Sequence, residues 1–318
     1  MQVPGCYDRS PREVALFAYV IEWGWLKIGS YGVMMALGFL AAWYLFRSEL
    51  RRKGLDTELA SRITFNAAIW GVIGGRLLSI LEEPSHLTDN PIKTLLLEGG
   101  LTWYGGLAAG AAATVYTIWK AKAPYLRVID AMSPAAMVGY SFGRGGCFFS
   151  GDGCYGIATD LPWGMQFPKL VETPGFHCMQ QGAIAQWPPV DPSTCTDLSD
   201  LSTCLRYPAD VHVHPTPLYE ILAGLALFGL MWALRKRIHR TGVMLGLFLV
   251  LQAIPRVLVE FIRLNPRYGG LSLSQWVSIA MLFLGVWLFW RARNLPPETA
   301  PADAAAPEPK SRRRRHRK

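Results

Sequence analysis

Five ionisable side chains interrupt long apolar stretches of this sequence: Arg76, Arg144, Glu220, Arg256 and Glu260. A charged group at membrane depth is costly, and such residues usually pair with one another or mark a functional site. Arg256, Glu260 and Arg263 are spaced four and three residues apart, so they lie on one face of a helix. Glu260 can pair with either arginine, and such a pair is either part of a functional site or only a tie between helices.

Arg144 stands in the run Gly143-Arg144-Gly145-Gly146, which predicts a break in the regular backbone. Irregular backbone at membrane depth is tolerated where it is buried in protein or lines a cavity, and glycine lets a ligand approach the chain closely. A guanidinium group binds phosphate through two charge-assisted hydrogen bonds. We therefore predict that Arg144 binds a phosphate group.

Two further motifs hold candidate site residues near the starts of apolar segments. Residues 101–107 read Leu-Thr-Trp-Tyr-Gly-Gly-Leu, and residues 214–220 read His-Pro-Thr-Pro-Leu-Tyr-Glu. Gly105 and Gly106 are candidates for a substrate contact, although Gly106, with Gly110 and Ala113, also suits close packing between helices. Proline near a helix start is common, whereas a glutamate one turn inside the membrane, as at Glu220, points to a function.

Long apolar helices must position these residues, because the chain is 51% hydrophobic and only 17% charged. An average soluble domain is about 25% charged, so the composition excludes a disordered protein and argues against a soluble enzyme. A spanning helix needs about 20 mostly apolar residues. The sequence predicts an all-α integral membrane protein with about seven transmembrane helices, at residues 28–46, 63–81, 99–119, 127–145, 215–234, 242–262 and 271–290.

Basic residues predict the orientation, because cytoplasmic loops carry an excess of lysine and arginine. Residues 47–62 hold five and residues 235–240 hold four, whereas residues 82–98 hold one. This alternation places the N-terminus outside and the C-terminus in the cytoplasm.

In this orientation, residues 1–27 are an amphipathic arm on the outer surface rather than a signal peptide. Residues 28–290 form the transmembrane domain. Residues 291–318 form a disordered basic tail that binds anionic lipid or fixes topology, rather than binding nucleic acid.

The six cysteines fall on or next to the outer side in this topology, and four of them lie within residues 151–214. This segment is therefore an external loop or subdomain in a compartment that permits disulfides. Bonds among Cys178, Cys195 and Cys204 are expected, but the sequence does not fix their pairing. The set Cys147, Cys154, His177 and Cys178 matches no standard zinc spacing. We predict no metal site.

Six sets of short motifs occur in one order along residues 25–290. They are Tyr31-Gly32, Gly74-Gly75-Arg76, Tyr104-Gly105-Gly106-Leu107, Gly143-Arg144-Gly145-Gly146-Cys147-Phe148 with Tyr155-Gly156, His214 to Glu220, and Gly246-Leu247-Phe248 followed by Arg256 to Arg263. Each motif alone is weak, but the ordered set is specific. In this order the motifs resemble the prolipoprotein diacylglyceryl transferases of bacterial inner membranes.

The resemblance implies a reaction that needs no metal or soluble cofactor. The diacylglyceryl group of phosphatidylglycerol moves to the lipobox cysteine thiol of a preprolipoprotein, and glycerol 1-phosphate leaves. Residues 28–290 would form the catalytic domain, with membrane lipids around it and no nucleic acid as a partner. Arg144 and Arg256 match the family's two key arginines, Glu260 would orient Arg256, and Tyr104 is the fourth catalytic candidate. The candidates for substrate binding are Tyr31, Gly105, Gly106, Cys147, His214, Tyr219, Glu220 and Arg263.

Two site positions depart from the common pattern of that family. Tyr104 stands where many members have a histidine that is a proposed general base, and Cys147 replaces a common asparagine. A free tyrosine titrates near pH 10, so the thiol proton has three alternative routes. The arginines acidify the thiol, or Glu220 or His214 accepts its proton. The departures also favour, as an alternative function, another acceptor or phospholipid binding without turnover. A transporter would need an internal repeat, and the sequence has none that we recognise.

Overall fold

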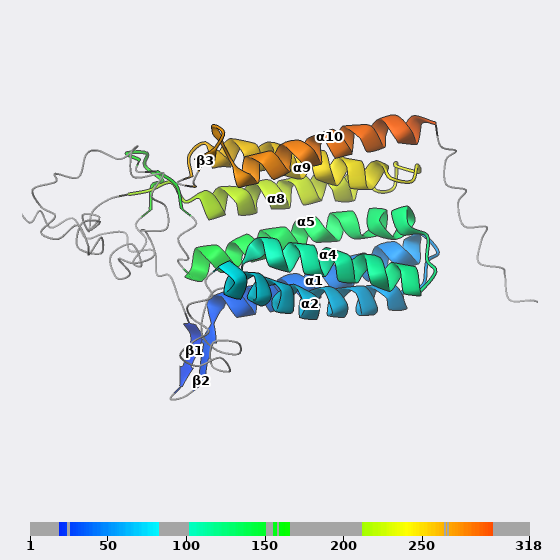
Figure 1. Ribbon diagram of the computed structural model, residues 1–318, viewed down its shortest axis with the longest axis horizontal. Helices are drawn as coiled ribbons and strands as arrows, with labels where there is room; N and C mark the ends of the chain where they lie inside the picture. Colours follow the sequence, from blue (N-terminus) through cyan, green and yellow to red (C-terminus); the bar gives the residue numbers. More distant parts are fainter. Residues whose placement is uncertain are drawn as a thin grey trace, which may run out of the picture.

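The computed structural model describes residues 19–23, 26–82, 102–150, 155–157, 159–165, 212–263, 265 and 267–294. In this part of the chain, seven helices run side by side as a bundle (Figure 1). They are α1 (Ser30–Arg52), α2 (Glu58–Glu82), α4 (Trp103–Lys120), α5 (Tyr125–Ser150), α8 (Thr216–Leu234), α9 (Val243–Glu260) and α10 (Leu273–Arg293). Each of the seven apolar segments of the sequence coincides with one of these helices.

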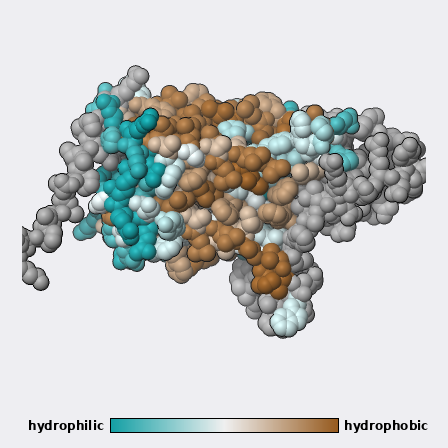
Figure 2. All heavy atoms as spheres, turned by 180° about the vertical axis from the view of Figure 1, so that it is seen from behind, coloured by the Kyte–Doolittle hydropathy of each residue, from teal (hydrophilic) through white to brown (hydrophobic). Residues whose placement is uncertain are grey.

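Five of these helices are long and apolar enough to cross a membrane: α1, α2, α8, α9 and α10. The protein is therefore a multi-pass, mostly helical membrane protein. Of the other two, α4 is rich in glycine, alanine and threonine, and α5 carries Arg127, Asp130 and Arg144. Large apolar side chains such as Leu40, Phe65 and Phe283 point outward and make a broad apolar surface, bordered at one end of the bundle by a polar band (Figure 2).

Two short β-hairpins lie at the opposite end of the bundle from that polar band (Figure 1). Strands β1 (Tyr19–Trp23) and β2 (Leu26–Gly29) pair antiparallel just before α1, and β3 (Arg267–Tyr268) pairs with β4 (Leu271–Ser272) just before α10. The described part of the predicted N-terminal arm is thus a β-hairpin. Trp23 is 81% exposed there, as expected of a membrane-interface residue, while Trp25 lies outside the described residues.

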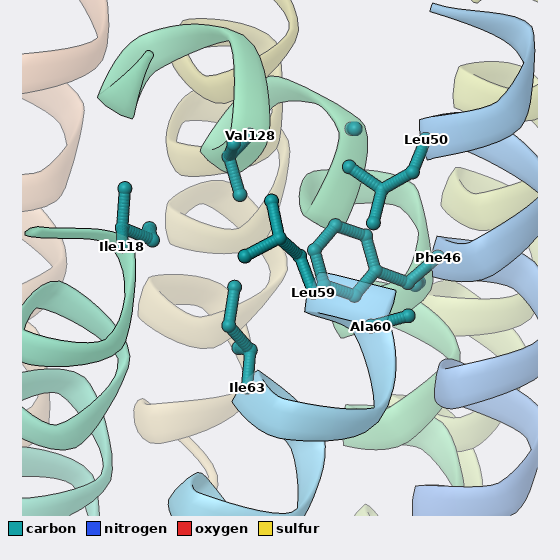
Figure 3. Close-up of a cluster of buried hydrophobic side chains, with 9 residues drawn as sticks. Phe46, Leu50, Leu59, Ala60, Ile63, Ile118 and Val128 are labelled. Carbon is teal, nitrogen blue, oxygen red and sulfur yellow. The ribbon is translucent and has the colours of Figure 1, made fainter. Parts of the chain in front are cut away.

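The main hydrophobic core joins α1, α2, α4 and α5 toward the polar band (Figure 3). Phe46 and Leu50 of α1 pack there against Ile63 of α2, Ile118 of α4 and Val128 of α5, all of them buried. These side chains pack together between the four helices and are shielded from solvent. Each would cost about 1 kcal/mol or more if it were truncated.

Buried polar side chains tie the helix ends together at the polar band. Glu49 of α1 binds Arg52 one turn away, and it also binds Arg235 at the end of α8, with 2.8 Å between its Oε1 and Nε of Arg235. Asp130 of α5 accepts hydrogen bonds from the backbone nitrogens of Gly242 and Leu245, at 2.5 and 2.8 Å. These are unpaired donors at the start of α9, so a carboxylate on a neighbouring helix acts as their cap.

Candidate active site

Glu220 is the centre of the charged site, and it is buried one turn inside α8. Its Oε1 accepts hydrogen bonds from Oη of Tyr140 at 2.5 Å and from Nη1 of Arg256 at 2.8 Å. Its Oε2 lies 3.3 Å from Nε of Arg144 and 4.0 Å from Nη1 of Arg263. One carboxylate therefore faces three arginines from two other parts of the chain.

Helical spacing brings these side chains to one place. Tyr140 and Arg144 are four residues apart on α5, so they share a face, and Nε of Arg144 donates to Oη of Tyr140 at 3.3 Å. Arg256 and Glu260 are four residues apart on α9, and Nη2 of Arg256 lies 3.3 Å from Oε2 of Glu260. Of the two arginines that the spacing offered to Glu260, Arg256 is the one that forms the ion pair. Because Arg256 also binds Glu220, the pair is part of a larger charged network.

Arg256 also reaches a hydroxyl group on α10. Its Nη2 donates to Oγ of Ser274 at 2.7 Å, and that oxygen lies 3.5 Å from Oη of Tyr104 on α4. Ser274 lies in the first turn of α10, between Ser272 and Gln275, which form a capping box. A rigid helix start therefore holds the serine between the arginine and the tyrosine.

The charges of this site do not cancel. Arg144, Arg256 and Arg263 face Glu220 and Glu260, so three positive groups meet two negative ones. The three arginine side chains are only 9–15% exposed, and water screens buried charges poorly. The site therefore has the composition expected for binding one additional anion.

A short segment after α5 holds Arg263 and His214 beside the site. The backbone of Gly156 and Ile157 bonds to His214 and Ile262, with N–O distances of 2.8 to 3.0 Å. A Cβ at position 156 would lie 2.6 Å from the carbonyl oxygen of Ile262. Only glycine lets these two pieces of backbone approach so closely.

His214 belongs to a small cluster next to this segment. Its Nδ1 lies 3.2 Å from Oη of Tyr219, and that oxygen accepts a 2.9 Å hydrogen bond from Nε1 of Trp163. Partial burial lowers the pKa of His214 below its usual value, because a desolvated imidazolium is disfavoured. A neutral His214 can accept the hydroxyl proton of Tyr219 in a hydrogen bond.

A sequence model described as prolipoprotein diacylglyceryl transferase matches residues 18–291. Similar proteins named phosphatidylglycerol–prolipoprotein diacylglyceryl transferase occur in Clostridium tetani and Geobacter sulfurreducens. The first is 30% identical over 267 residues, covering 83% of this chain and 93% of the relative. The second is 31% identical over 273 residues, covering 83% and 90%. The chain belongs to the prolipoprotein diacylglyceryl transferase family.

The structure brings together six of the residues predicted for this diacylglyceryl transferase site. Arg144, Arg256, Arg263, Glu220 and Glu260 form the charged network, and Tyr104 joins it through the hydroxyl of Ser274. His214 and Tyr219 lie in the neighbouring cluster with Trp163. Tyr31 packs across α5 at the level of Gly146, and Cys147, the next residue of α5, is half-buried.

Gly105 and Gly106 have a packing role that the substrate prediction did not give them. A Cβ at Gly105 would lie 2.4 Å from the carbonyl oxygen of Gly74 on α2, and one at Gly106 would lie 3.2 Å from that of Gly71. These glycines let α4 lie directly on α2. The structure therefore supports the close-packing role, and the substrate contact of these glycines stays a prediction.

The predicted backbone break at residues 143–146 is wrong, because α5 runs as one helix from Tyr125 to Ser150. The glycines serve packing here as well. A Cβ at Gly145 would lie 2.5 Å from Cε of Met34, and one at Gly146 would lie 2.8 Å from Cδ2 of Tyr31. Helix α1 can therefore lie close against α5, and the regular helix fixes the direction of Arg144.

Sequence reasoning missed three members of the network: Tyr140, Ser274 and Asn265. Tyr140 precedes Arg144 by four residues, which is a signal that helical spacing offers. Asn265 donates from Nδ2 to Oε1 of Glu260, and Ser274 binds Arg256. Neither of these has a sequence signal, because both depend on how the segment after α9 folds back. The cysteines of the expected disulfides, and all of the considered metal set except Cys147, lie outside the described residues.

Proposed function

We propose that this chain transfers the diacylglyceryl group of phosphatidylglycerol to the lipobox cysteine thiol of a preprolipoprotein. Membership of the transferase family and the names of the relatives support this reaction. The observation that carries the proposal is the net positive site around Glu220, in which Glu220 and Arg256 stand on two helices, α8 and α9, that are apolar enough to cross a membrane. Such a site suits the phosphate of a lipid that enters from the bilayer.

The reaction exchanges one bond for another. The sulfur of the cysteine attacks the carbon of the diacylglyceryl unit that is bonded to the phosphate oxygen, and a carbon–sulfur bond forms. The carbon–oxygen bond to the phosphate breaks, and its electron pair leaves with glycerol 1-phosphate. The phosphate changes from a singly charged diester to a monoester with more negative charge, so fixed cations aimed at its oxygens lower the barrier.

Arg144 and Arg256 are the cations that we assign to this phosphate. Before substrate binds, Glu220 holds both guanidinium groups in place. Arg256 is further fixed by Glu260 and Ser274. An arginine held on several sides loses little freedom when the phosphate arrives, and this preorganisation makes electrostatic stabilisation effective. Arg263, 4.0 Å from Glu220, adds charge on the side of the Gly156 segment.

Three routes for the thiol proton remain as proposals with different support. Two nearby arginines lower the pKa of a thiol, which requires no separate base. His214, one of the two alternative bases, bonds to Tyr219 in the neighbouring cluster, and its lowered pKa keeps it neutral. Tyr104 is not one of these routes, but it reaches Arg256 through Ser274 and can donate a hydrogen bond to the leaving oxygen. Glu220 is poorly suited to be the base while it is buried among arginines, because protonating it would leave their charges uncompensated.

We further propose seven spans, with the N-terminus outside and the C-terminus in the cytoplasm of a bacterial inner membrane. The connections from α1 to α2, from α4 to α5 and from α8 to α9 lie at one end of the bundle (Figure 1). These connections carry the basic clusters that favour the cytoplasmic side. The starts of α4 and α8, which carry Tyr104 and Glu220, lie at the other end, so the site would open to the outer leaflet.

A transfer assay in detergent tests the proposed function. The purified chain is incubated with a lipobox peptide and either phosphatidylglycerol or phosphatidylcholine, and the peptide mass is measured. We expect a thioether-linked diacylglyceryl peptide with phosphatidylglycerol only, together with released glycerol phosphate. A Cys→Ser lipobox peptide should give no product. A folded protein that binds phosphatidylglycerol but modifies no lipobox peptide would instead support the alternative of another acceptor or a lipid-binding role.

A further inference from the structure

A groove between α1 and α2 runs from the first turns of α2, at the basic end of the bundle, toward the middle of the two helices. We name it the α1/α2 groove and define it by Phe39, Trp43, Ser61, Arg62, Thr64 and Ala68. It adjoins an apolar cavity of about 270 Å³ between α1, α2 and α5, and Phe39 and Thr64 line both. The cavity contains almost no polar surface, so it suits a hydrocarbon chain.

The length of the cavity fits one leaflet of a membrane. Along α1 it extends from Met35 to Phe46, and at 1.5 Å per residue this is about 16 Å. Half of a bilayer's hydrocarbon core is about 15 Å thick. An acyl chain in this cavity would extend as far as Met35, whose sulfur lies 3.7 Å from where a Cβ of Gly143 would stand, so the end of the chain would approach the level of Arg144.

Polar and basic groups surround the end of the groove where a lipid headgroup would lie. Nε1 of Trp43 donates to Oγ of Ser61 at 3.1 Å, and the guanidinium of Arg47 lies 5.5 Å from the centre of the Trp43 ring. Arg62 lines the groove beside them. Tryptophan at this depth is typical of a membrane interface, and two arginines beside it attract an anionic headgroup.

Arg47 and Arg62 differ from several other arginines at the basic end of the bundle, whose side chains are engaged by other protein groups. Arg52 and Arg235 are paired with Glu49, and Arg240 donates to the carbonyl of Ala292. Among the residues that the structure describes, no carboxylate lies within ion-pair distance of Arg47 or Arg62, although Glu58 precedes Arg62 by one turn. The groove thus combines an apolar tail cavity with uncompensated positive charge at its mouth.

We propose that the α1/α2 groove is a binding site for an anionic phospholipid of the leaflet at the basic end. This lipid is separate from the reacting phosphatidylglycerol, because its headgroup would lie at the opposite end of the bundle from Arg144 and Arg256. A preprolipoprotein signal peptide is the competing occupant. The basic n-region of a signal peptide would meet Arg47 and Arg62 with the same sign of charge, so the groove favours the lipid.

Native mass spectrometry of the full chain in detergent tests this site. Phosphatidylserine and phosphatidylcholine with identical acyl chains are the probes. We expect the wild type to bind one phosphatidylserine at least about tenfold more tightly than phosphatidylcholine, because two arginines act on the headgroup. The double variant Arg47→Glu/Arg62→Glu should lose this preference. The matched variant Arg237→Glu/Arg291→Glu changes the same charge at the same end, on exposed residues away from the groove, and should keep it.

A second variant separates the tail cavity from simple surface attraction. Thr64→Phe fills the space where the groove and the cavity meet, and it leaves both arginines in place. It should also remove the tightly bound phosphatidylserine, with the unfolding temperature confirming that the protein is folded. Equal binding of phosphatidylserine by the two double variants, or wild-type binding of phosphatidylserine by folded Thr64→Phe, would overturn the proposal. Displacement of the lipid by a signal peptide would assign the groove to the peptide and overturn it as well.

Discussion

Oε1 of Glu220 on α8 lies 2.8 Å from Nη1 of Arg256 on α9, and the two side chains are 1% and 15% exposed. The pair stands inside a bundle whose outer surface is apolar, so neither charge has bulk water to stabilise it. Each charge depends on the other, and the surplus of arginines around them is what a phosphate would neutralise. The charge balance of the site therefore predicts how single substitutions behave.

Replacing Glu220 with glutamine should destabilise the protein and lower its activity together. The change leaves Arg144 and Arg256 without their shared carboxylate, and breaking a buried pair costs about 3–5 kcal/mol. Thermal unfolding and initial transfer rates measure the two effects. Glu260→Gln is the matched comparison, because Glu260 pairs with Arg256 at 3.3 Å and is also bound by Asn265. A smaller loss of stability for Glu220→Gln than for Glu260→Gln would contradict the central place of Glu220.

Tyr104 and Ser274 should act as one unit. Ser274→Ala removes the hydroxyl that links Arg256 to Tyr104, so Tyr104→Phe should cost little more in that background. We expect each single variant to lower the transfer rate about tenfold, as expected for loss of one positioned hydrogen-bonding group, and the double variant to be close to either. A double-mutant cycle on the rate measures this coupling. Strictly additive effects would show that Tyr104 acts independently of Ser274.

The bundle could be predicted from the sequence because membrane helices follow a simple length rule. Every apolar segment became a helix, and helical spacing offered two arginines to Glu260, of which Arg256 forms the ion pair. Glu220 was found because a carboxylate is costly inside an apolar segment. Its place as the centre of three arginines could not be predicted, since that depends on how α5, α8 and α9 pack.

Glycine was the residue type that misled the sequence reasoning. The run from Gly143 to Gly146 suggested irregular backbone, and the motif with Gly105 suggested either a substrate contact or close packing. In the structure both lie in regular helices that pack closely on a neighbour. The two roles have the same local sequence, because both require the absence of a side chain. The position of the neighbouring helix decides between the two roles. For Gly105 that neighbour is α2, at Gly74.

Gly105→Ala should therefore destabilise the protein through packing. The new methyl group would meet the backbone oxygen of Gly74 at 2.4 Å, and backbone cannot move away easily. Overpacking of this kind costs about 1–3 kcal/mol, which should appear as a lower unfolding temperature in detergent. Gly229→Ala is the control, because nothing lies within 4 Å of its added Cβ. An unchanged unfolding temperature for Gly105→Ala would contradict the packing role.

The stability of the protein should fall on mild acidification, partly through His214. Burial lowers the pKa of His214 in the folded state, whereas an unfolded histidine titrates near pH 6.5. The unfolded state then binds more protons, so this contribution is full above about pH 6.5 and declines as the pH falls through the lowered pKa. Unfolding temperatures from pH 7.5 to 5.5 should fall less for His214→Gln than for the wild type. Parallel curves would show that His214 does not contribute.

The transfer rate of Arg144→Ala and Arg256→Ala, compared with Arg235→Ala, tests the central claim most directly. Arg235 is also a buried arginine paired with a glutamate, and its side chain is 15% exposed like that of Arg256, but it lies at the opposite end of the bundle. With phosphatidylglycerol and a lipobox peptide, we expect the two site variants to lose at least about 100-fold in rate, as for removal of a preorganised charge-stabilising group. Folded Arg235→Ala should remain within about threefold of the wild type, because its pair makes no contact with the reacting phosphate. Equal losses in all three variants, or full activity in folded Arg144→Ala or Arg256→Ala, would contradict the assignment of these arginines to the phosphate.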